Sequence, residues 1–113
     1  MTIDLLREFC LSLPAATEDI KWGNDLVFSV GGKMFCVTSL DPPIKFSFKV
    51  QDDEFEEFSM QDGFIPAPYM ARAKWVLATD TNKLSKKIWQ DYIYSSYEMV
   101  KLTKKLRMEL GIN

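Results

Sequence analysis

Residues 26–40 read LVFSVGGKMFCVTSL, two apolar runs joined by a pair of glycines. Glycine adopts positive φ without steric cost, so Gly31-Gly32 suits a tight hairpin turn. The flanking runs, Leu26 to Val30 and Met34 to Leu40, are rich in the β-branched and aromatic residues that strands favour. The stretch therefore predicts an antiparallel β-hairpin, and we expect further strands to pair beside it.

Two further segments predict strands of the same sheet. In residues 44–50 the even positions are apolar and the odd positions are Lys45, Ser47 and Lys49. This alternation is typical of a strand with one buried and one solvated face, and Asp41-Pro42-Pro43 forms the turn before it. Residues 74–78 predict a fourth strand, because Trp75 and Leu77 fall on one face.

Three segments predict helices. Apolar residues recur at helical spacing from Ile3 to Leu13, and Pro14 ends that helix. Residues 52–58 place acidic side chains at a helix start, with two phenylalanines on one face. Ser85 can cap a last helix that runs toward Leu110, with Gly111 beyond its end. On the polar side of this last helix, several lysines lie among or beside Tyr94 and Tyr97.

The element order α-β-β-β-α-β-α predicts an α+β fold, and the length of 113 residues fits one domain over residues 1–113. An antiparallel sheet of about four strands needs helices on its apolar face. The N- and C-terminal helices have the broadest apolar stripes, so we expect them to pack there and to leave the other face open.

The composition of the chain excludes several classes of catalytic and metal-binding site. The chain has no histidine, which removes the usual zinc-finger ligands and the serine and cysteine triads. Cys10 and Cys36 have no close pairing motif, and we expect both to be reduced and packed. Gly31-Gly32-Lys33 lacks the spacing of a phosphate-binding loop. We therefore expect a non-enzymatic protein without a cofactor.

The sequence also predicts where in the cell the protein is located. No apolar run approaches the roughly 20 residues of a membrane span. Residues 1–13 carry Asp4, Arg7 and Glu8, which is unlike the apolar centre of a secretory signal. We expect a cytoplasmic monomer that does not associate with membranes.

Residues 63–75 read GFIPAPYMARAKW, two prolines followed by aromatic and cationic residues. Proline fixes φ and biases the preceding residue toward extended conformations, so this tract predicts a stiff platform for recognition. Charge is also uneven, with a net −7 over residues 1–62 and a net +5 over residues 63–113. A local basic surface is therefore compatible with the overall net charge of −2.

Several patterns together resemble the MmcQ/YjbR family of small bacterial proteins. They are Leu13-Pro14, residues 17–23 (TEDIKWG), 25–28 (DLVF), 31–35 (GGKMF), 66–69 (PAPY), Arg72, 74–76 (KWV), Ser96-Tyr97 and Val100. The resemblance implies a CyaY-like sandwich, similar to frataxin and called a double-wing arrangement, and a role in DNA binding. Asn24 stands where many relatives have histidine.

Our leading hypothesis is a DNA-binding domain in which cations contact phosphate and aromatic rings stack on bases. The candidate residues are Lys21, Trp22, Tyr69, Arg72, Lys74, Lys101, Lys104 and Lys105. The same residues also fit a structural explanation, with the tryptophans packed and the cations solvated. One alternative is a protein-interaction module anchored by Tyr69, Tyr94 and Tyr97. A weaker one is a frataxin-like metal carrier that uses the acidic residues 52–57.

Overall fold

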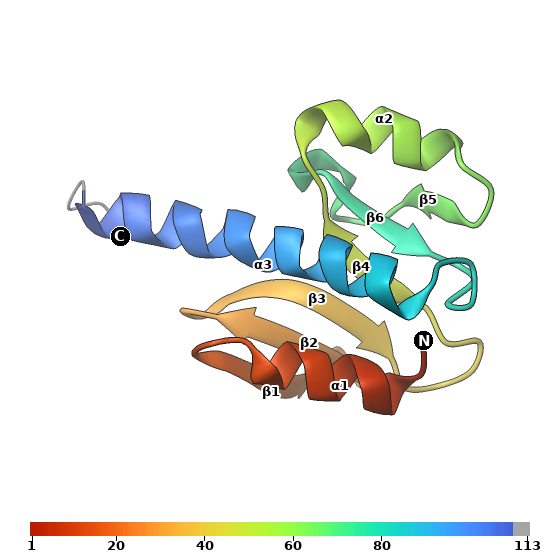
Figure 1. The fold of residues 1–113 in the computed structure, drawn as a ribbon, viewed down its shortest axis with the longest axis horizontal. Helices are drawn as coiled ribbons and strands as arrows, with labels where there is room; N and C mark the ends of the chain where they lie inside the picture. Colours follow the sequence, from red (N-terminus) through yellow and green to blue (C-terminus); the bar gives the residue numbers. More distant parts are fainter. Residues whose placement is uncertain (110–113) are drawn as a thin grey trace.

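The computed structural model describes the backbone of residues 1–109 and the side chains of residues 1–101. Within residues 1–109, three α-helices and six strands follow one another (Figure 1). The elements are α1 Ile3–Ser12, β1 Ala16–Lys21, β2 Asp25–Val30, β3 Lys33–Ser39, β4 Phe46–Lys49, α2 Asp52–Met60, β5 Phe64–Pro66, the 3-10 turn η1 Ala71–Ala73, β6 Trp75–Ala78 and α3 Lys86–Glu109. The predicted α+β domain is confirmed.

Each predicted helix forms where side chains can satisfy its first free amides. The hydroxyl of Thr2 accepts from the Leu5 amide at 3.2 Å, and α1 ends ahead of Pro14. In α2 the Glu54 carboxylate accepts from the amide of Gln51. The Ser85 hydroxyl accepts from the third residue of α3, which confirms the predicted cap.

The sheet is fully antiparallel, with the strand order β1-β2-β3-β4-β6-β5. The central hairpin, β2 and β3, forms as predicted, but the expectation of about four strands is wrong because β1 and β5 were missed. β1 (ATEDIK) is an edge strand whose side chains are mostly exposed, so it lacks the apolar alternation of a half-buried strand. β5 has three residues and ends in proline, which is compatible only with an edge position.

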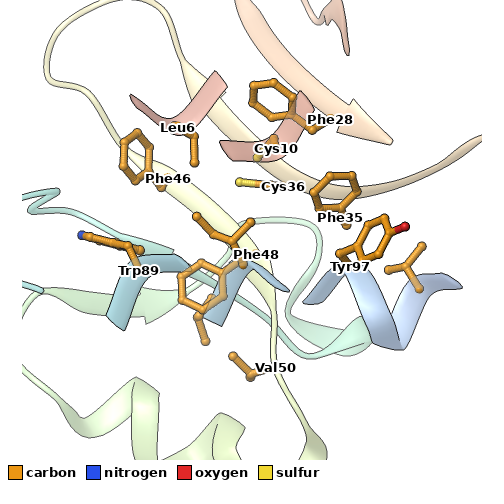
Figure 2. Close-up of a cluster of buried hydrophobic side chains, with 14 of the residues drawn as sticks. Leu6, Cys10, Phe28, Phe35, Cys36, Phe46, Phe48, Val50, Trp89 and Tyr97 are labelled. Atoms are coloured by element: carbon orange, nitrogen blue, oxygen red, sulfur yellow. The ribbon is translucent and has the colours of Figure 1, made fainter. Parts of the chain in front are cut away.

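The three α-helices pack on one face of the sheet, with α1 over β1, α3 over β3 and β4, and α2 over β5 and β6 (Figure 1). Large buried side chains fill the layer between them (Figure 2). Phe46 and Phe48 of β4 meet the indole of Trp89 edge-to-face, with ring centroids 5.3 and 5.8 Å apart. None of the helices within the described residues is long and apolar enough to cross a membrane.

Ser96 of α3 joins the helix layer to the centre of the sheet. The β3–β4 ladder ends at Cys36 and Phe48, so Phe35 and Lys49 come next in register. The Ser96 hydroxyl lies between them: it donates to the Phe35 carbonyl at 2.6 Å and accepts from the Lys49 amide at 3.0 Å. A side chain thus supplies the next connection where the two strands stop pairing directly.

Tyr97 is buried, with 1% of its surface exposed, and its hydroxyl donates to the carbonyl of Pro14 at 2.7 Å. The prediction that it serves as an exposed interface anchor is therefore wrong. The helical wheel placed Tyr97 beside lysines, but α1 and the chain after it cover that side of α3. Tyr94, one of the other two proposed anchors, is half-exposed.

Cys10 of α1 and Cys36 of β3 are free and buried, as predicted, and their sulfur atoms face each other in the core (Figure 2). The hydrogen bond with the Cys36 thiol and burial both raise the pKa of Cys10 far above its ordinary value. The Cys10 thiol therefore stays protonated, and it is a packing group and not a nucleophile.

Candidate functional site

The candidate site lies on the sheet face opposite the three α-helices, which we call the open face. Because side chains alternate along a strand, the ladder register decides which residues share it. One row crosses all six strands in register and consists of Asp19, Val27, Val37, Ser47, Leu77 and Ile65. The row is apolar except at Asp19, its outer end, and at Ser47 on β4.

Residues 67–74, which we call the cover segment, fold back over part of this face. The Ala67 amide donates to the Trp75 carbonyl at 3.0 Å, and the Trp75 amide donates to the Met70 carbonyl at 3.2 Å. Ala67 and Trp75 are buried against Val27 and Val37 in a second, smaller core. Trp75 is thus a packing residue, which was one of the two explanations that the sequence left open.

A pocket of about 540 Å³ lies between the cover segment, the β1–β2 turn and the strands. Its lining consists of Trp22, Asp25, Val37, Ser47, Ala67, Pro68, Tyr69, Met70 and Leu77. The volume falls within the range of small-molecule and cofactor sites, and most of the lining is apolar or aromatic, as in such sites. The pocket can therefore take one flat or apolar group of a ligand.

Two large aromatic residues of the lining are exposed to solvent. Trp22 is 66% exposed and Tyr69 is fully exposed. Both have a left-handed backbone, with φ of 51° and 66°. Bulky residues rarely adopt this conformation, which costs about 1–3 kcal/mol and persists only where the surroundings impose it. The fold thus holds two apolar rings in water, at a backbone cost, beside an apolar pocket.

Asp25 and Ser47 are the polar members of the lining apart from the two aromatic rings. Ser47 is only 7% exposed, and among the described side chains its hydroxyl has no hydrogen-bond partner. Asp25 is half-buried at the start of β2, directly across from Lys21 and Ser39. No described cation lies within ion-pair distance of its carboxylate. Both groups are available to a ligand.

The structure brings together only part of the predicted residue set. Lys21 is exposed at the end of β1, on the same face as Asp25 and next to Trp22. Arg72 is exposed in η1, three residues after Tyr69. Lys21, Trp22, Tyr69 and Arg72 therefore belong to the pocket or to the segments that form its rim.

The other predicted cations lie elsewhere. Lys74 places its ammonium 5.0 Å from the ring centre of Phe55 on α2. Lys101 lies on α3, across the sheet from the open face, with its ammonium 4.0 Å from the Glu98 carboxylate and 5.5 Å from the Tyr97 ring centre. Lys104 and Lys105 are outside the residues whose side chains the structure describes. Of the predicted cations that the structure describes, Lys21 and Arg72 thus lie on the segments that form the pocket rim, whereas Lys74 and Lys101 do not.

Sequence reasoning missed most of the pocket lining: Asp25, Val37, Ser47, Ala67, Pro68, Met70 and Leu77. One signal was available, because the alternation in residues 44–50 placed Ser47 on the face away from the core. Nothing in the local sequence indicates that Ser47 lies between Val37 and Leu77, since that depends on the pairing of three strands.

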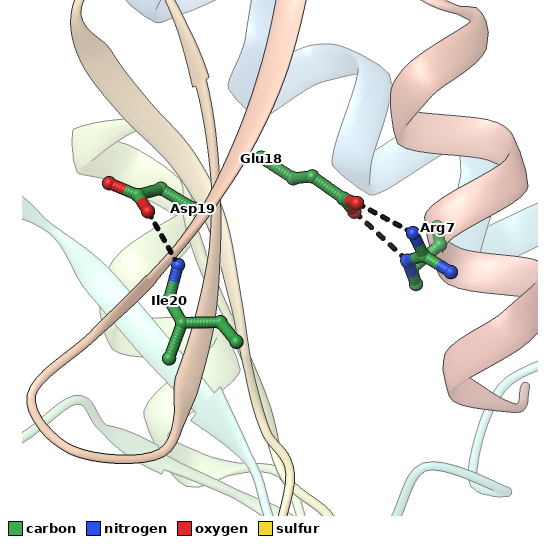
Figure 3. Close-up of polar contacts among 4 residues, drawn as sticks. All are labelled: Arg7, Glu18, Asp19 and Ile20. Carbon is green, nitrogen blue, oxygen red and sulfur yellow. Dashed lines mark hydrogen bonds and ion pairs between the residues drawn. The ribbon is translucent and has the colours of Figure 1, made fainter.

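The β1 edge of the sheet is less suited to binding than the open face. Glu18 accepts two hydrogen bonds from the Arg7 guanidinium, at 2.6 and 2.9 Å, and this lowers the pKa of Glu18 (Figure 3). The Asp19 carboxylate accepts from the Ile20 amide, and the Ala16 amide donates to a loop carbonyl. Two amides of β1 thus already have partners, which leaves fewer free donors for an added strand at this edge.

The YjbR family model matches residues 11–99, which cover most of the chain including the pocket. The chain belongs to the YjbR family. Its fold is similar to that of Deinococcus radiodurans protein DR2400, a DUF419 domain, with a TM-score of 0.81, 28% identity and coverage of 99% of this chain and 89% of that one. A Pseudomonas syringae protein shares the fold, with a TM-score of 0.73, 16% identity and coverage of 88% and 99%. No curated protein gives a significant match.

Proposed function

We propose that this YjbR protein is a non-enzymatic binding domain whose open-face pocket takes one unpaired base of single-stranded nucleic acid. The observation that supports this most is the pair of exposed rings, Trp22 and Tyr69, held by left-handed backbone beside an apolar pocket. Every base has a flat face, so exposed aromatic rings bind single strands with little dependence on sequence. A base within a duplex is stacked on both faces and paired along one edge, so it cannot enter such a pocket.

Two cations lie where a strand backbone would pass. Lys21 precedes Trp22 and Arg72 follows Tyr69 by three residues, and both are exposed. Contact with about two phosphates gives a slope of log affinity against log salt of about −1.4 for single strands. Raising salt from about 50 to about 200 mM then weakens binding about sevenfold. The net charge of −2 keeps the affinity moderate.

Fluorescence anisotropy with a labelled single-stranded oligonucleotide of mixed sequence tests the proposal. Alanine at Trp22 or Tyr69 removes one stacking partner, which weakens binding about fivefold to about 150-fold. Tyr94→Ala is the matched control, because Tyr94 is a half-exposed tyrosine of α3, far from the pocket lining. Equal effects of Tyr69→Ala and Tyr94→Ala, or no binding at low salt, would refute the proposal.

The same assay distinguishes the contributions of the individual cationic side chains to binding. Arg72→Ala halves the salt slope if Arg72 contacts one of two phosphates, whereas Lys101→Ala leaves it unchanged. Lys101 lies on the opposite side of the sheet from the pocket. A Lys101 effect as large as that of Arg72 would move the binding surface to α3 and contradict the assignment of the site.

A protein partner is the second candidate. Tryptophan, tyrosine and arginine are the residue types that most often dominate protein interfaces, and Trp22, Tyr69 and Arg72 are all exposed here. Failure of every oligonucleotide to bind would favour this candidate. The metal-carrier alternative, which came from the CyaY-like resemblance, gains no support, because no group of three potential ligands lies together among the described residues.

A further inference from the structure

We infer that the pocket distinguishes between bases, and that it prefers a base with an exocyclic amino group, such as cytosine, over thymine. The inference rests on the proposed function and concerns the same site. It depends on the two polar groups inside the pocket, Asp25 and Ser47, and on the apolar residues around them.

The hydroxyl of Ser47 is placed as a contact point for a ligand. Ser47 is flanked in register by Val37 and Leu77, and it is 7% exposed in a pocket of mainly apolar lining. The hydroxyl has no hydrogen-bond partner among the described residues, and none of their fully buried side-chain polar atoms lacks one, so the Ser47 hydroxyl is open to the pocket and a bound group can form a hydrogen bond with it.

Asp25 sets the polarity of the pocket. An ionised carboxylate only accepts hydrogen bonds, so it favours N–H groups and repels carbonyl oxygens. Cytosine presents an amino group at the position where thymine presents a carbonyl oxygen, and aspartate is a known partner of that amino group. From strand spacing, the Cα atoms of Asp25 and Ser47 lie about 12 Å apart. Their side chains can therefore contact opposite sides of one ring.

Competition between oligo(dC) and oligo(dT) of equal length tests the preference, because the two pyrimidines differ little in stacking area. One correct hydrogen-bonded pairing discriminates by about 1–3 kcal/mol, so oligo(dC) binds about fivefold or more tightly than oligo(dT). The measurement is made at neutral pH or above, where oligo(dC) remains single-stranded. Ser47→Ala weakens oligo(dC) binding about twofold to about tenfold.

Asp25→Asn is the decisive variant, since its amide can donate to the thymine carbonyl, and it brings the ratio of the two affinities to one or below. Asp19→Asn is the matched control: it removes the same charge from the same face but does not line the pocket. Urea unfolding of each variant confirms that it folds.

Three results would overturn the inference. Tight binding of both oligonucleotides with a ratio near one in the unmodified protein would refute base preference and leave the proposed function standing. An equal change of the ratio in Asp19→Asn would assign the effect to net charge. Failure of both oligonucleotides to bind would refute the inference and the proposed function together.

Discussion

Replacing Ser96 with alanine removes the hydroxyl that joins α3 to β3 and β4, which makes it a sharp test of how this fold is held together. Two backbone groups lose their partner, the fully buried carbonyl of Phe35 and the part-buried amide of Lys49. A buried group left without a hydrogen bond costs about 1–3 kcal/mol, and the Lys49 amide falls at the lower end because water can reach it.

Alanine has a higher helix propensity than serine, which offsets up to about 0.5 kcal/mol of this loss in stability. The net loss of unfolding free energy is then about 2–3 kcal/mol, a large fraction of the about 5–15 kcal/mol of a typical domain. In urea this corresponds to a decrease in the midpoint of about 1–2 M.

Ser95→Ala is the control, because Ser95 is the neighbouring serine of the same helix and its hydroxyl has no hydrogen bond among the described residues. It measures the gain in helix propensity alone. Amide hydrogen exchange adds a local readout, since the Lys49 amide in Ser96→Ala should exchange faster than its neighbours in β4. A midpoint shift no larger than that of Ser95→Ala, with normal Lys49 protection, would refute the reasoning.

Three further predictions concern other contacts. Tyr97→Phe removes the hydrogen bond to the Pro14 carbonyl, so the free energy of unfolding measured in urea falls by about 1 kcal/mol. A decrease above about 3 kcal/mol would contradict this prediction. Trp22→Gly removes left-handed strain from an exposed residue, so the unfolding free energy stays constant or rises by up to about 1 kcal/mol, while oligonucleotide binding weakens as in Trp22→Ala. The hydrogen bond from Arg7 lowers the pKa of Glu18, so the unmodified protein is more stable than Glu18→Gln above pH 4.5, and this difference disappears as pH falls through the lowered pKa. Unfolding measured over a range of acidic pH tests this, and a difference that stays constant with pH would contradict it.

The elements with strong local signals could be predicted from the sequence. The β2–β3 hairpin has a glycine pair between apolar runs, and α3 has an apolar stripe with Ser85 at its start. The two missed strands, β1 and β5, lie at the sheet edges. An edge strand buries little surface, so its sequence has no strong alternation to detect.

Of the predicted site, the exposed aromatic residues Trp22 and Tyr69 belong to the pocket, whereas Lys74 and Lys101 lie against other groups. Lysine side chains are long and flexible, so their neighbours decide where the charge lies. The sequence could show that cations are present but not whether they converge.

The sequence alone therefore determined the secondary structure of the core and the family, because propensity, periodicity and turn chemistry act between near neighbours. Tertiary structure alone decided that Trp22, Asp25, Ser47 and Tyr69 line one pocket, and that Tyr97 is buried. The pocket residues come from three segments that are distant in the chain, and the ladder register and the packing of the cover segment bring these segments together. Register depends on pairing between strands, which no single segment encodes.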